Sequence, residues 1–220
     1  MGATNSETKN NKYYSLKCKS SEQETVHFAK SEKINGSWTT SGTFDTMVGT
    51  LSSAAIREKE YQGAKYNVFV LGITDEHENA LVEMPHASVT YSIISSLCSL
   101  PPSGVGITDL MIRVYKKRSD DGKWWSQAYL EFGGQKLGWG IKPNDAPKKV
   151  PVLKPDGTPF LQNGKAVYDD SAMKAFWEEK FNTIVVPLVT PRSAKQQAME
   201  KSAMKANENF DQGNDGDLPF

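Results

Sequence analysis

The chain has 220 residues, enough for one large domain or one domain with an elaborated end, and its 26 basic and 26 acidic residues balance. Cys18 and Cys98 have no metal-ligand spacing and define no disulfide framework, which fits a reducing compartment. The first twelve residues hold no signal-peptide core, and no apolar run approaches the ~18 residues of a membrane span. These features argue against secretion and membrane insertion, and we expect a soluble cytoplasmic protein.

Strand-like runs dominate the first two-thirds of the chain, because β-branched and aromatic residues are concentrated between turn sequences. The predicted strands are 13–19, 26–29, 44–59, 66–73, 81–84, 110–117 and 124–132. The clearest turns are Asn35-Gly36, Gln62-Gly63, 75–79 and 120–122.

One helix is predicted between these strand groups, within residues 85–100. Its apolar stripe, which Pro101-Pro102 ends, consists of Ala87, Tyr91, Ile94 and Cys98. The order of strands, helix and two-strand hairpin predicts a mainly β fold. It matches an OB-fold, a five-stranded barrel with a helix between its third and fourth strands. Other small β-barrels produce a similar string of elements.

The character of the chain changes after Gly140. Residues 143–164 are rich in Pro, Gly and Lys and predict an irregular hairpin extension. Asp170-Ser171 is then predicted to cap a short amphipathic helix whose stripe, best explained as core packing, is Met173, Phe176, Trp177 and Phe181. The predicted organisation is a flexible N-terminus at 1–12, an OB-fold-like domain at 13–190 with its extension at 141–190, a linker at 191–206 and an acidic tail at 207–220.

The tail concentrates charge of one sign. Its acidic residues, with no Lys or Arg among them, are Glu208, Asp211, Asp215 and Asp217. Residues 1–206 therefore hold 26 basic and 22 acidic residues, so a body of +4 carries a tail of −4. The apolar tip Leu218-Pro219-Phe220 cannot bury itself in such a polar segment, and its physical use is insertion into a pocket of a partner.

The tip Asp217-Leu218-Pro219-Phe220 closely resembles the C-terminal tips of bacterial and phage single-stranded DNA-binding proteins, which end in Asp-(Ile/Leu)-Pro-Phe. The resemblance covers only the tail, and the short linker and the Pro/Gly extension depart from the bacterial pattern. It implies a phage-type protein of the host cytoplasm that acts in DNA replication, recombination and repair. It also implies that Phe220 fills a pocket of a partner enzyme while Asp215 and Asp217 steer the encounter.

The hairpin of 110–117 and 124–132 is the best predicted site for DNA. Side chains alternate across a strand, so the outer face should carry Arg113, Tyr115, Lys117, Lys123, Trp125, Gln127 and Tyr129. The inner face should carry Ile112, Val114, Trp124, Ala128, Leu130 and Phe132. Bases stack on flat rings while Lys and Arg neutralise phosphates, so such a surface binds single strands of any sequence. The alternative is that Trp125 and Tyr129 pack beneath the C-terminal extension.

A second hairpin repeats this pattern with Arg57, Lys59 and Tyr61 before the Gln62-Gly63 turn and with Lys65 and Tyr66 after it, and a solvated charged turn is its alternative. Trp139 either stacks on a base or anchors the extension. Trp38 is either a core or a contact residue.

Signals for catalysis are weak. The cluster at 75–78 includes His77 but resembles a turn, no second ligand pair supports a metal, and no nucleophile or phosphate-loop pattern is present. We therefore expect a non-enzymatic protein without cofactor, and self-association remains open. The alternatives are an RNA-binding or strand-annealing protein and a β-rich structural protein of a virion.

Overall fold

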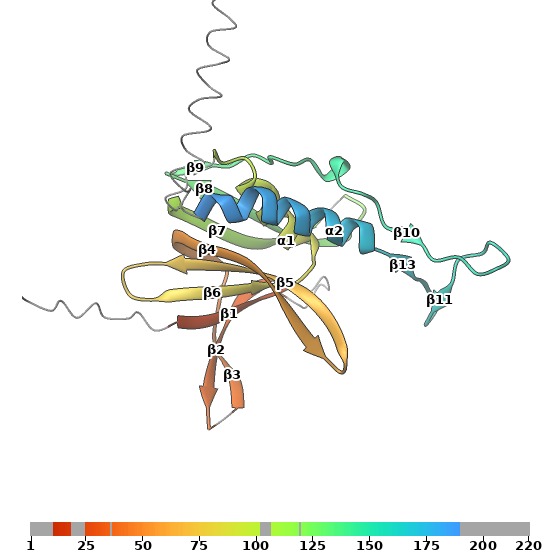
Figure 1. Ribbon diagram of the computed structural model, residues 1–220, viewed down its shortest axis with the longest axis horizontal. Helices are drawn as coiled ribbons and strands as arrows, with labels where there is room; N and C mark the ends of the chain where they lie inside the picture. The colour runs from red at the N-terminus through yellow and green to blue at the C-terminus, as the bar shows by residue number, and fades with distance from the viewer. Residues whose placement is uncertain (1–10, 19–24, 36, 102–106, 119, 190–220) are drawn as a thin grey trace, which may run out of the picture.

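A computed structural model describes residues 11–18, 25–35, 37–101, 107–118 and 120–189. These residues form a nine-stranded sheet of order β3-β2-β1-β6-β5-β4-β7-β8-β9 (Figure 1). Its strands are β1 (Asn11–Lys17), β2 (His27–Ile34), β3 (Ser37–Phe44), β4 (Thr46–Tyr61), β5 (Ala64–Thr74), β6 (Asn79–Met84), β7 (Ile107–Arg118), β8 (Trp124–Phe132) and β9 (Gln135–Lys136). The mainly β prediction is confirmed. The predictions for 1–10 and 190–220 lie outside the described residues.

β4 curls this sheet. Its first half pairs with β7 and its second half with β5, and the register shifts between Gly49 and Leu51 and between Leu51 and Ser53. Gly49 has a φ of 155°, and a Cβ atom there would lie 2.7 Å from the Thr74 carbonyl oxygen. The bend therefore requires glycine at this position.

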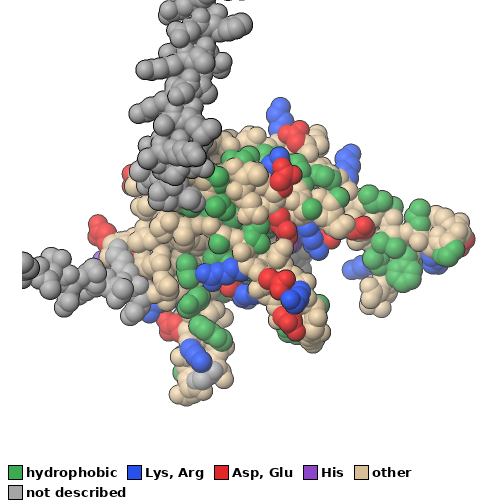
Figure 2. Space-filling model, viewed as in Figure 1, with side chains coloured by type: hydrophobic (Ala, Val, Ile, Leu, Met, Phe, Trp, Pro, Cys, Tyr) green, Lys and Arg blue, Asp and Glu red, His purple; other side chains and the backbone are tan. Residues whose placement is uncertain are grey.

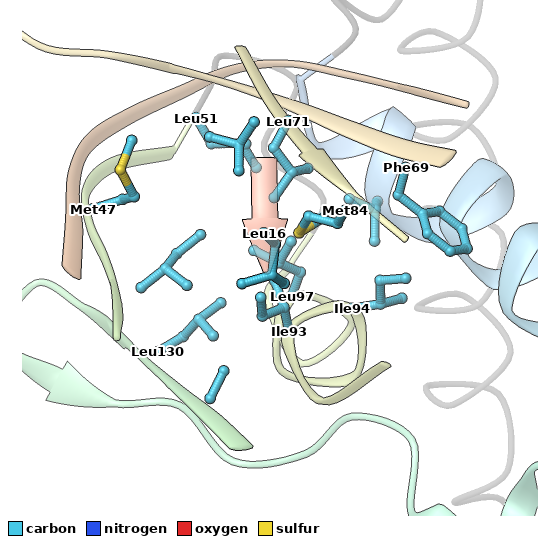
Figure 3. Close-up of a cluster of buried hydrophobic side chains, with 14 of the residues drawn as sticks. Leu16, Met47, Leu51, Phe69, Leu71, Met84, Ile93, Ile94, Leu97 and Leu130 are labelled. Carbon is cyan, nitrogen blue, oxygen red and sulfur yellow. The ribbon is translucent and has the colours of Figure 1, made fainter. Parts of the chain in front are cut away.

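The hydrophobic core lies on one face of the curled sheet, which we call the core face; the opposite face is the outer face. Leu51, Phe69 and Leu71 project from the core face and are fully buried. They pack around α1 (Ser88–Leu97), which contributes Ile93 and Ile94 (Figure 3). The predicted helix is confirmed, and its Val and Ile residues suit it because they are buried by the sheet.

The C-terminal helical segment also covers the core face. It consists of α2 (Ser171–Lys180), the π-helical turn η2 (Phe181–Val185) and α3 (Val186–Val189). Phe181 is fully buried, with its ring centroid 5.0 Å from that of Phe69, and Trp177 stacks on Tyr91 at 4.9 Å. Pro187 lacks an N–H and crowds the carbonyl four residues earlier, which accounts for the wider turn before it.

Polar contacts fix this segment in place. The His86 ring lies 3.0 Å from both the Tyr91 hydroxyl and the Glu178 carboxylate, and burial lowers the pKa of His86 although Glu178 partly opposes the shift. The Asp169 carboxylate accepts a hydrogen bond from the Ser171 N–H at 2.9 Å. Asp170 occupies the predicted N-cap position of α2, but its side chain makes no capping hydrogen bond and pairs with Lys174 instead.

A closed five-stranded barrel is not formed by the described residues. Closure of these strands into a barrel would require β6 to pair with β8. Instead, β6 pairs with β1 in parallel, and β8 pairs with β7 and β9. Helices α1 and α2 to α3 cover the core face, so apolar burial is completed by helices instead of by closure of the sheet.

β3 was not predicted as a strand. Its sequence is polar and rich in Ser and Thr, and seven of its eight residues are exposed, so it has no apolar alternation to detect. The hairpin of β2 and β3 projects from the body as one arm, and the tip of β4 and β5 projects as another (Figure 1).

The predicted irregular extension follows β9 and forms a third projection (Figure 1). It contains η1 (Pro143–Asp145), β10 (Val150–Pro151), β11 (Leu161–Gln162), β12 (Lys165–Ala166) and β13 (Tyr168–Asp169). β10 pairs with β13 and β11 with β12, and each of these strands is two residues long.

Candidate nucleic-acid interface

The outer face of β7 and β8 carries the side chains that alternation predicted. Arg113, Tyr115 and Lys117 lie directly opposite Tyr129, Gln127 and Trp125 in the antiparallel register. The rings of Tyr115 and Tyr129 meet edge to face with centroids 5.9 Å apart, and the Tyr115 hydroxyl donates to Gln127 Oε1 at 3.1 Å. Leu130 and Ala128 point to the core face, as predicted.

Cations lie among these rings. The Lys136 ammonium sits 5.5 Å from the centre of the Tyr129 ring, and Arg113 pairs with Asp45 at 3.6 Å. The hydrogen bond that Arg113 donates to the Tyr129 hydroxyl oxygen, followed by the charges of Tyr129 and Asp45, raises the pKa of the Arg113 guanidinium. Lys123, at the hairpin turn, pairs with Asp121 at 2.8 Å. Both ion pairs are exposed, so a phosphate can replace the two aspartates at little cost.

A cavity of about 740 Å³ adjoins this face. It lies between β8, α1, the segment after β9 and α2, and Trp125, Tyr129 and Trp139 line it together with Lys136 and Lys148. Trp125 is 50% exposed and Tyr129 is half-buried, and both share this cavity with residues of the extension.

Trp139 lies at the start of the extension. It is 52% exposed, whereas its neighbour Ile141 is buried. The Gly140 N–H donates to the Ser95 carbonyl at 2.9 Å, and the Ser95 hydroxyl donates to the Ile141 carbonyl at 2.5 Å. Gly140 and Ile141 hold the extension against α1, and Trp139 is left as an exposed ring beside the cavity.

The β4–β5 arm carries the second predicted cluster. In its register, Arg57, Lys59, Tyr61 and Tyr66 share the outer face. Glu58 and Glu60 fall on the opposite face because side chains alternate. Lys59 pairs with Glu83 of the next strand but one, and the other three side chains are exposed. Lys65 lies with Glu58 and Glu60 on that opposite face and pairs with Glu58 at 2.9 Å, so the basic residues of the arm are divided between its two faces.

The structure does not bring the two clusters into contact. Both lie on the outer face, but Thr46 of β4 pairs with Arg113 whereas Arg57 is eleven residues further along the same strand, about 36 Å of extended chain. The predicted partner-binding residues, Asp215, Asp217, Leu218, Pro219 and Phe220, lie outside the described residues.

Two strand-end residues lie on the predicted side of the sheet but are not buried there. Trp124 is only half-buried, and the Lys116 ammonium and the Arg118 guanidinium lie 5.1 and 5.8 Å from its ring. Phe132 is 38% exposed. Lys116 and Arg118 occupy the core-side positions of β7 that face Trp124. Two charged residues at such positions indicate in the sequence that this end of the strand extends beyond the hydrophobic core.

None of the helices in the described part of the chain has both the length and the apolar character needed to span a bilayer. The same residues contain no cluster of three or more His, Cys, Asp or Glu side chains that could hold a metal ion. Comparison of the chain with protein-family models, with curated proteins and with solved structures gave no match.

Proposed function

We propose that this protein binds single-stranded DNA without sequence preference, protects it during replication, recombination and repair, and recruits partner enzymes through its C-terminal tip. One observation carries the proposal. Along two separate hairpins, aromatic and cationic side chains share the outer face, and on the β4–β5 arm the acidic residues lie on the opposite face. Aromatic rings bind bases of any identity, and cations bind the phosphates between them.

The strand order adds support. Strands β6-β5-β4-β7-β8, with α1 between β6 and β7, have the order and the helix position of an OB-fold. We propose that the domain is an OB-fold whose barrel is held open by β1 and the C-terminal helices. In that arrangement the β4–β5 tip and the β7–β8 turn would be the loops that flank a bound strand.

Titration of the tryptophan fluorescence with poly-dT at several salt concentrations tests the proposal. Trp125 and Trp139 are exposed on the candidate interface. We expect strong quenching and an affinity that falls steeply with salt, because each neutralised phosphate adds about 0.7 to the logarithmic salt slope for single strands. Absence of binding at low salt would refute the proposal.

Competition with RNA and with duplex DNA then tests the runner-up. Preference for RNA would favour an RNA-binding protein. Preference for poly-dT over both would exclude that alternative and leave the proposal in place.

A further inference from the structure

The outer face is concave where the two arms leave it. Val68, Val70 and Leu81 form an apolar cluster of their own, separate from the main core. They lie on the outer face, because Val68 pairs with Arg57 and Leu81 pairs with Tyr13. Each is nevertheless at most 8% exposed. Neighbouring side chains therefore cover these three residues, which lie beneath a recess between the two arms, and Figure 2 shows a gap between the arms.

The wall opposite the β4–β5 arm carries its own rings and charge. Trp38 is 60% exposed, and its ring meets that of Tyr13 edge to face with centroids 5.5 Å apart. Lys33 lies directly opposite Trp38 in the register of β2 and β3. Its neighbour Glu32 points to the other face, as Glu58 and Glu60 do on the first arm.

The recess therefore has the same chemistry on both walls. Lys33 lies on the same outer face as Arg57 and Lys59 of the other arm. Glu83 is the acidic side chain that the register places on this face near Val70 and Leu81, and it is paired with Lys59. A row of cations and exposed rings complements a chain of phosphates that carries flat bases. An acidic peptide would use the cations and leave the exposed rings without partners.

We infer that the two arms form a clamp in which single-stranded DNA lies, with Tyr13, Lys33 and Trp38 as binding residues opposite Arg57, Tyr61 and Tyr66. This inference rests on the proposed function and adds a second wall to its site. The sheet path from β3 to β4 covers five inter-strand steps of ~4.8 Å, about 24 Å, so the clamp engages a strand over several nucleotides.

Neighbouring residues with opposite orientations supply matched variants of the full chain. Trp38→Ala removes a ring from the recess, and Ile34→Ala removes a 51% exposed apolar side chain of the same arm from the other face. Lys33→Ala and Glu32→Ala form the charge pair. All four positions lie outside the hydrophobic core, and melting curves of each variant confirm that the fold is kept.

Binding is measured by anisotropy of a labelled oligo-dT longer than the ~16 nucleotides that one such domain covers. We expect Trp38→Ala to weaken binding about 5- to 150-fold, the range for loss of one base-ring stack, and Ile34→Ala to leave it unchanged. Lys33→Ala should lower the salt slope by about 0.7, and Glu32→Ala should not lower it.

The other outcomes separate the two proposals. If Trp38→Ala and Lys33→Ala bind as the wild type does while Trp125→Ala binds weakly, the clamp is wrong and the proposed function stands. If the wild type does not bind oligo-dT at all, both fail. If the Trp38 change alters the sedimentation of the free protein and leaves DNA affinity unchanged, the recess is an interface between copies of the chain and the clamp is again wrong.

Discussion

Gly140 shows how one residue without a side chain determines where a functional ring lies. A Cβ atom on Gly140 would lie 2.5 Å from both the Cys98 carbonyl carbon and the Ser99 nitrogen. Both are backbone atoms at the end of α1, which cannot rotate away as a side chain would. The close approach holds the start of the extension against α1 and leaves Trp139 exposed beside the cavity.

Replacing Gly140 by alanine should therefore destabilise the fold by about 1–3 kcal/mol, the usual cost of forcing extra atoms into a packed contact. Gly138→Ala is the matched control, because a Cβ atom there would meet no atom within 4 Å. Urea unfolding followed by circular dichroism measures both variants. Equal midpoints for Gly138→Ala and Gly140→Ala would show that the contact with α1 does not contribute to stability.

At the scale of the element, the C-terminal helical segment is part of the core and not an appendage. Phe181, Val185 and Leu188 are fully buried, and they come from its π-helical turn and from α3. The sheet does not close on itself, so these side chains cover apolar surface that a closed barrel would have covered with its own strands.

Phe181→Ala should accordingly lower the free energy of unfolding by about 3–5 kcal/mol, through loss of burial and the cavity left beside Phe69. Phe160→Ala removes the same ring from the projecting extension, where it is 46% exposed, and should change stability by less than about 0.5 kcal/mol. Chemical denaturation curves of the two variants provide the comparison. A small effect of Phe181→Ala would mean that the sheet and α1 are stable without the C-terminal helices.

At the scale of the whole molecule, local sequence patterns predicted which side chains share a face of a strand, but they did not predict which distant strands pair. Alternation has a period of two residues, so the positions of Arg113, Tyr115 and Tyr129 followed from the sequence alone. The parallel pairing of β1 with β6 joins residues more than sixty positions apart, and no local pattern records it. That pairing adds β1, β2 and β3 to the sheet beside β6 and so determines where Trp38 lies, which is why neither this edge of the sheet nor the position of Trp38 was predicted.

The charge distribution leads to a prediction for the whole chain. The body carries +4 and the tail −4, and the cations of the outer face are the groups that phosphates would contact. If the tail competes for these cations when DNA is absent, deletion of residues 207–220 should tighten binding of poly-dT at low salt. The effect should fade as the Debye length falls from about 30 Å at 0.01 M to about 3 Å at 1 M.

A variant in which Asp211, Asp215 and Asp217 become Asn keeps the length and the apolar tip, so it separates charge from size. Both variants should bind more tightly than the wild type by similar factors at low salt. Affinity that is unchanged or weaker after deletion would show that the tail does not compete for the surface and acts only toward other proteins.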